Sequence, residues 1–183
     1  MMPLNETVLI QWGAVLGASL VGAVTDYQSR RIPNALTGPL FLAGIGWSGG
    51  VAGWAGVGEA LLGAVLLGLP FVILFVFAGG GAGDAKLMGG IGTWLSIEHG
   101  VITLAAVALM GGLLGLILAA ATGRLRATLT RLRDVMLWFA IILFSRKLSL
   151  AGTADGPDAV RMPYGIAIFG GVCAAALYVA LRH

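Results

Sequence analysis

Residues 79–97 have the sequence GGGAGDAKLMGGIGTWLSI, in which a glycine-rich stretch leads into a short apolar run. The run at residues 87–97 would rise only about 17 Å as a helix, which is too short for a hydrocarbon core of about 30 Å. Longer apolar stretches lie on both sides of it. Whether this segment crosses a membrane therefore decides the topology of the whole chain.

The composition excludes a water-soluble protein. Of the 183 residues, 58% are hydrophobic and only 10% are charged, and the mean hydropathy is +0.97. An average soluble domain has about 25% charged residues. The length suits one membrane domain, residues 1–183, with room for about six spans of about 20 residues each. The predicted spans are residues 8–25, 35–55, 60–78, 87–97, 100–123 and 162–181.

The basic residues indicate how these spans are threaded. If residues 87–97 cross the membrane, ten of the eleven basic residues fall on one side, which is the positive-inside pattern. If the segment only dips in and returns, the arginines after Gly123 move to the other side and the pattern is lost. We therefore expect an all-α, polytopic bundle of six transmembrane helices with both termini outside the cytoplasm.

The remaining segments are assigned by composition. The arginine-rich residues 125–150 are expected to form a helix along the cytoplasmic interface, and residues 151–160 a polar loop. Trp47, Trp54 and Trp94 fall in the outer turns, where tryptophans commonly form an interfacial belt. Some glycines within the apolar runs are expected to allow close helix contacts. These are Gly63, Gly68, Gly111, Gly112 and Gly115.

Several classes of site find no support. One cysteine and two distant histidines give no disulfide framework and no metal-ligand spacing. We therefore expect no metal and no cofactor. The net charge of +3 comes from residues between the apolar runs, so it reports membrane topology and not a nucleic-acid surface.

Two aspartates stand out among the eight acidic residues. Asp26 and Asp84 each adjoin an apolar helix on the predicted cytoplasmic side, and the other six lie in loops or at outer ends. Ionisable residues in this setting are costly and often functional. Asp26 could instead be a turn residue beside topogenic arginines, and Asp84 could form a charge pair with Lys86 in a flexible joint.

Together the two acids suggest proton chemistry. Two carboxyl groups within a few ångströms cannot both ionise easily, so one keeps its proton. The ionised group can take a proton from water, and the protonated group can polarise a carbonyl. Such a pair titrates as a unit, so the sequence leaves open which residue has which role.

Three motifs resemble those of the type IV prepilin peptidases. GAGDAKLMGGIGTWL is similar to the family's GxGD block, DYQSRRIPNALT to its first aspartate block, and RMPYGIAI to its proline, tyrosine, glycine motif. This resemblance, which covers nearly the whole chain, implies that Asp26 and Asp84 are the catalytic aspartates. It also implies site-shaping roles for Gly81, Gly83, Lys86, Pro163, Tyr164 and Gly165.

The resemblance implies a membrane aspartic endopeptidase of the bacterial inner membrane. It would remove positively charged leader peptides from prepilins at the cytoplasmic face, with no metal. The chain lacks the CxxC pairs of the long members that also methylate pilins. It is more similar to the short peptidases of tight-adherence (Flp-type) pilus systems. Two other functions stay open: a transporter or channel that uses the aspartates for cations or protons, and a non-catalytic pilus assembly scaffold.

Overall fold

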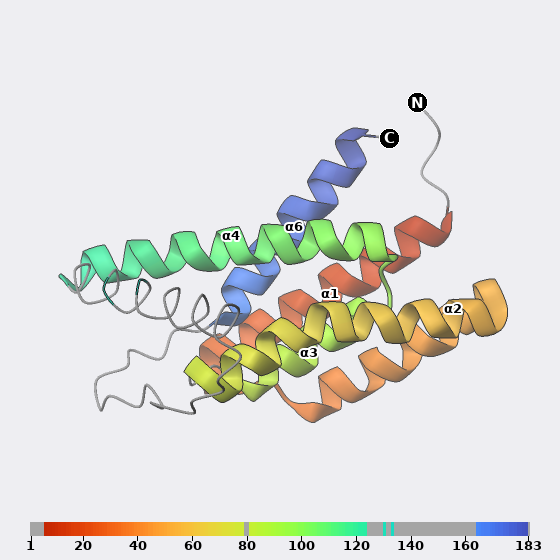
Figure 1. Cartoon of the computed structure of the whole chain (residues 1–183), viewed down its shortest axis with the longest axis horizontal. Helices are drawn as coiled ribbons and strands as arrows, with labels where there is room; N and C mark the ends of the chain where they lie inside the picture. The colour runs from red at the N-terminus through yellow and green to blue at the C-terminus, as the bar shows by residue number, and fades with distance from the viewer. Residues whose placement is uncertain (1–5, 79–80, 124–129, 131–132, 134–163, 183) are drawn as a thin grey trace, which may run out of the picture.

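A computed structural model of the chain describes residues 6–78, 81–123, 130, 133 and 164–182. Its helices are α1 (Glu6–Ser29), α2 (Asn34–Ala78), α3 (Ala82–Gly92), α4 (Ile97–Ala121) and α6 (Tyr164–Arg182). Within this part of the chain every regular element is a helix (Figure 1), which confirms the predicted all-α class. The predicted interfacial helix at residues 125–150 and the loop at residues 151–160 fall almost entirely outside the described residues.

The long element α2 consists of two helices that meet at a kink. Ala52 and Gly53 have non-helical backbone angles there, and Gly53 has a φ of 61°, a conformation that favours glycine. The chain reverses direction at this point, so the two arms of α2 run side by side (Figure 1). The arms correspond to the predicted spans at residues 35–55 and 60–78.

Four helices are long and apolar enough to cross a membrane: α1, α2 from Asn34 to Val76, α4 and α6. The chain is therefore a multi-pass membrane protein by length and composition. Because α2 has two arms, the described helices pass back and forth through the bundle, and α1 begins at the end where α6 finishes (Figure 1). Six transmembrane helices remain a prediction, because α3, with only 11 residues, is too short to count as a candidate span.

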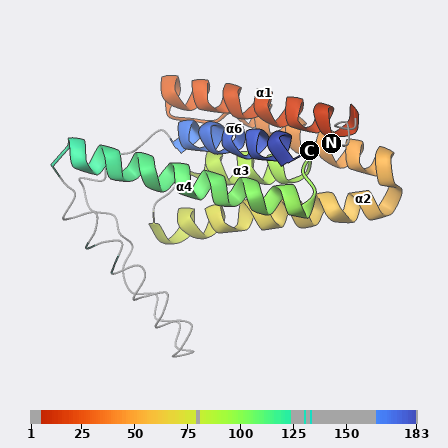
Figure 2. The ribbon, with the colours of Figure 1, turned by 90° about the horizontal axis from the view of Figure 1, so that it is seen from above.

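The short helix α3 contacts α1, α2 and α6 (Figure 2). From Asp84 to Gly92 every residue except Lys86 is buried. Glycines allow the second arm of α2 to approach α3. A Cβ added at Gly63 would overlap the carbonyl of Gly92, and one at Gly68 would lie 3.3 Å from the Cα of Gly89.

These contacts confirm the prediction that Gly63 and Gly68 allow close helix packing. Gly112 faces open space instead, so the prediction for that residue is wrong.

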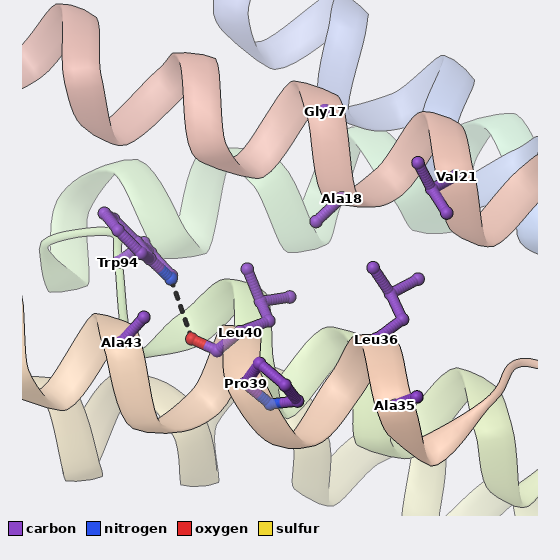
Figure 3. Close-up of a pocket in the computed structure, with 9 residues that line it drawn as sticks. All are labelled: Gly17, Ala18, Val21, Ala35, Leu36, Pro39, Leu40, Ala43 and Trp94. Carbon is purple, nitrogen blue, oxygen red and sulfur yellow. Dashed lines mark hydrogen bonds between the residues drawn. The ribbon is translucent and has the colours of Figure 1, made fainter.

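Trp94 holds the far end of α3 against the first arm of α2. Its indole Nε1 donates a hydrogen bond of 2.9 Å to the carbonyl of Leu40 (Figure 3), and its ring stacks on Trp47 with centroids 6.2 Å apart. Trp94 is buried, so it belongs to the core and not to an interfacial belt as predicted. Trp54, at the kink of α2, is 90% exposed and remains available for such a belt.

The glycine contact between α2 and α3 can be tested with Gly63→Ala. The added methyl group would overlap backbone atoms, which cannot move aside as a flexible side chain can, so we expect a loss of about 1–3 kcal/mol in the free energy of unfolding. Thermal unfolding of the detergent-purified protein would measure it. Gly58→Ala, in the same arm but with no atom within 4 Å of the added Cβ, is the matched control and should leave the midpoint unchanged or slightly raised. Equal midpoints for the two variants would contradict the contact.

Candidate active site

Asp26 lies in the last turn of α1. Arg30 follows with a φ of 52°, and its N–H donates to the Asp26 carbonyl at 2.8 Å. A left-handed residue at this position is a common way to end a helix, and Pro33 keeps the following chain from resuming it at once. The Asp26 side chain is only 9% exposed. It therefore faces the bundle, although it sits at a helix end beside arginines.

Asp84 lies in the first turn of α3. Gly81 is the N-cap, with extended backbone angles, and its carbonyl accepts a hydrogen bond of 3.2 Å from the Asp84 N–H. A Cβ at Gly81 would lie 2.6 Å from Oδ2 of Asp84, so the absence of a side chain there makes room for the carboxyl group. Asp84 is also 9% exposed. Both aspartates are thus buried at helix ends.

Two close contacts hold the start of α3 against the end of α1. A Cβ added at Gly22 would lie 2.8 Å from Cδ2 of Leu87, and one added at Gly83 would lie 3.0 Å from Cβ of Ile32. Both contacts depend on glycine, because a larger residue would separate the segments. The end of α1 and the start of α3 therefore meet, and the two carboxyl groups that they carry lie at the same end of the bundle.

The carboxyl group of Asp84, which lies outside the four candidate spans, has a pKa well above its usual value. Burial, with a smaller contribution from the negative charge of Asp26, raises its pKa from the usual 3.8 to about 7. Desolvation and a like charge both disfavour the ionised form of an acid. Asp84 therefore holds a proton over much of the range in which an ordinary aspartate is ionised.

The first turn of α6 contacts Asp26 directly. The backbone N–H of Gly165 donates a buried hydrogen bond of 2.9 Å to Oδ2 of Asp26. A Cβ at Gly165 would lie 2.9 Å from Cβ of Asp26 and 3.1 Å from Cα of Ala23, so only glycine permits this approach. Gly165, which the sequence motif places in the site, thus lies against one of the aspartates. Pro163 lies outside the described residues.

Tyr164 adds a hydroxyl group close to the carboxyl groups. Its ring meets Phe71 edge to face with centroids 5.8 Å apart, and it lies within electrostatic range of Asp84. The hydroxyl end rests against Gly111, where an added Cβ would overlap it. Sequence reasoning did not connect Phe71 or Gly111 with the site. Gly111 was expected only as a helix contact, and no motif marks Phe71.

The side chain of Lys86 is bonded to α2 and not to an aspartate. Its Nζ donates a hydrogen bond of 3.0 Å to Oδ1 of Asn34, and both side chains are exposed. Within the described part of the chain no ion pair joins Lys86 to Asp84, so the alternative of a charge pair at this joint is wrong.

Lys86 and Asn34 border an apolar cavity of about 670 Å³ between α2 and α3. Neither this cavity nor the one of about 380 Å³ in Figure 3 is lined by an aspartate.

The described residues contain no group of three or more His, Cys, Asp or Glu side chains that could hold a metal ion. What the site offers is a pair of buried carboxyl groups, one amide donor and one nearby phenol. Such groups can hold a proton and pass it to a bound molecule.

The fold and site define a class of protein: a polytopic helical membrane protein with two buried carboxyl groups at one end of its bundle. A profile of the type IV leader peptidase family matches residues 14–116, more than half of the chain, and this range includes both aspartates. The chain therefore belongs to the type IV leader peptidase family, in agreement with the resemblance of its motifs. No curated protein and no solved structure gives a significant match to it.

The raised pKa of Asp84 has a consequence for stability. The folded protein holds this proton more tightly than the unfolded chain, whose aspartate titrates near 3.8, so the free energy of unfolding falls as pH rises from that value through about 7. Asp84→Asn removes the titrating group, and we expect its unfolding midpoint to fall less than that of the wild type between pH values of about 5 and 8. Thermal unfolding at both pH values measures the difference. An equal fall in the two proteins would contradict the burial of a protonated Asp84.

Proposed function

We propose that this chain is an aspartic endopeptidase that removes the leader peptide from prepilin-type substrates at the cytoplasmic face of a bacterial inner membrane. Its family implies a leader peptidase with prepilin-type substrates and a membrane setting. One observation supports the aspartic mechanism: two buried carboxyl groups from α1 and α3 lie close enough for the charge of Asp26 to raise the pKa of Asp84.

The chemistry of such a pair suits hydrolysis of a peptide bond. A carboxylate accepts a proton from water, which makes the water oxygen a better nucleophile, while a carboxylic acid donates to the oxygen of the scissile carbonyl. Both functions need one protonated and one ionised group at the same pH. Mutual repulsion between two neighbouring carboxylates provides that state near neutral pH.

The charges at the two ends of the bundle support a cytoplasmic site. Arg30, Arg31 and Lys86 lie beside the aspartates, at the end of α1 and the start of α3. Glu59 and Glu98 lie at the opposite end, near the kink of α2 and the start of α4. The positive-inside rule assigns the basic end to the cytoplasm.

The proposed topology has six passes, with α3 as the short one. Because α3 is buried among other helices, it does not need to match the full thickness of the lipid by itself. One cluster of buried hydrophobic residues draws members from all five described helices, which supports a single domain over residues 1–183. As substrates we propose the Flp-type prepilins of tight-adherence systems, to whose short peptidases the motifs are similar.

The aspartate pair is tested by Asp26→Asn and Asp84→Asn, each assayed with the purified protein and a prepilin substrate. Each amide removes a proton-transfer group, so we expect cleavage to slow by roughly 10²–10⁴-fold. The matched control is Glu98→Gln, the same loss of an acid at the opposite, exposed end of the bundle, and it should cleave at the wild-type rate.

The same assay separates the other two functions. A transporter or channel would move solute in proteoliposomes without cutting prepilin. A scaffold would support pilus assembly in cells with Asp84→Ala, whereas a peptidase with that substitution would not. Normal cleavage by a folded Asp26→Asn protein would end the aspartic proposal.

The position of Tyr164 gives a second test, because two adjacent glycines of α4 differ in what they face. Gly111→Ala would push against the Tyr164 hydroxyl, whereas Gly112→Ala meets no atom within 4 Å. We expect Gly111→Ala to lower kcat by roughly 10- to 100-fold through displacement of groups at the site. Gly112→Ala should match the wild type in the same prepilin cleavage assay. Equal activity of both variants would contradict a role for the Tyr164 position.

A further inference from the structure

The two aspartates are equally buried but have different hydrogen-bond surroundings. Each is 9% exposed. Asp26 accepts the 2.9 Å hydrogen bond from the Gly165 N–H at Oδ2, and among the described residues nothing donates to its Oδ1. Across the same described part of the chain, no group donates a hydrogen bond to the carboxyl group of Asp84. The pair is therefore asymmetric in its protein environment.

The donor to Asp26 favours negative charge on that residue. Gly165 is the second residue of α6, so its N–H is one of the first four in the helix, which have no acceptor within the helix. These groups carry the positive end of the helix dipole. A hydrogen bond from such a group to a carboxylate is stronger than one to a neutral acid.

The dipoles of α1 and α3 favour negative charge on Asp84 over Asp26, which is opposite to the effect of this hydrogen bond. Asp84 lies in the first turn of α3, which favours negative charge, and Asp26 lies in the last turn of α1, which disfavours it. Both are effects of position without a direct donor in the described residues. A buried, direct amide bond to the charged atom is the stronger influence.

We infer that Asp26 is the ionised base of the pair, that Asp84 is the protonated acid, and that Gly165 is the positioning residue that fixes this division of roles. The inference rests on the proposed function and assigns the roles that the sequence leaves open. It also gives the first turn of α6, beside the Tyr164 phenol, a specific task at the site.

The roles define the order of proton transfers in hydrolysis. Asp26 takes one proton from water, and the water oxygen forms a bond to the scissile carbonyl carbon while Asp84 donates its proton to the carbonyl oxygen. This gives a neutral gem-diol with Asp26 protonated and Asp84 ionised. The carbon–nitrogen bond then breaks, Asp26 gives its proton to the leaving nitrogen, and Asp84 recovers a proton from a diol hydroxyl. Both residues return to their starting states.

The groups around Asp84 agree with its assignment as the acid. Asp26 on α1 and Tyr164 on α6 interact with it electrostatically, and on its own helix Lys86 is hydrogen-bonded to Asn34. Burial, with a smaller contribution from Asp26, raises the pKa of Asp84 to about 7.

The proton can be located without any substrate, by infrared spectroscopy of the purified protein at about pH 6, where ordinary Asp and Glu side chains are ionised. The wild type should show the carbonyl stretching band of a protonated carboxyl group. The band should disappear in Asp84→Asn and persist in Asp26→Asn.

The opposite pattern, or loss of the band in both variants, would overturn the assignment, and so would its absence from the wild type. Because no cleavage is measured, this result is independent of the proposed function. A wild-type protein that shows the band but cuts no prepilin would defeat the peptidase proposal and leave the proton on Asp84.

The role of Gly165 is tested by Gly165→Ala, with Gly170→Ala on the same helix as the matched control. The methyl group at residue 165 would press on Asp26 and Ala23, whereas that at residue 170 meets chiefly the flexible end of Met110. We expect Gly165→Ala to lower kcat for prepilin cleavage by about 10- to 100-fold, the effect of losing a hydrogen bond to a charged group. KM should change little.

The pH dependence of kcat separates this positioning role from a general loss of packing. Alanine keeps the backbone N–H, but its methyl group would push Asp26 away from that donor. The acid limb of the profile should therefore move to higher pH in Gly165→Ala and stay in place in Gly170→Ala. A lower kcat with an unmoved acid limb would overturn the role of Gly165. If Gly165→Ala does not fold, the infrared comparison of the two aspartate variants still decides where the proton lies.

Discussion

The backbone contact between α3 and the second arm of α2 is the constraint on which the site depends. Gly63 lies against Gly92, and Gly68 against Gly89, so the two helices approach more closely than side chains would allow. Close packing of this kind is a main source of helix association in membranes. It holds a helix of 11 residues inside the bundle, and the first turn of that helix carries Asp84.

Because α3 is held inside the bundle, the carboxyl group of Asp84 is buried away from water, and this burial raises its pKa. Burial alone makes ionisation of Asp84 unfavourable, and the neighbouring Asp26 adds a like charge. The energy of desolvation is therefore used to keep an acid protonated near neutral pH. An exposed pair of aspartates on the same helices would both ionise at neutral pH, so neither would keep a proton.

The third participant is α6, which comes from the far end of the chain. Its first turn supplies the Gly165 N–H to Asp26 and places Tyr164 between Phe71 and Gly111. Residues of α1, α2, α4 and α6 thus meet near the start of α3. The site belongs to the assembly of helices and not to any one segment, which explains why a single glycine-to-alanine change far from both aspartates in sequence is expected to alter the reaction.

The sequence by itself determined the helical class and the apolar character of the long helices, and it predicted Asp26 and Asp84 as site residues, because hydropathy, charge placement and motifs are local properties. It also marked Gly81, Gly83 and Gly165, although not what each contacts.

Only the tertiary structure decided that Trp94 lies in the core, that Lys86 donates a hydrogen bond to Asn34, and that the Tyr164 hydroxyl packs against Gly111. These depend on which helix faces meet, and nearly uniform apolar helices carry no periodic signal that would fix those faces.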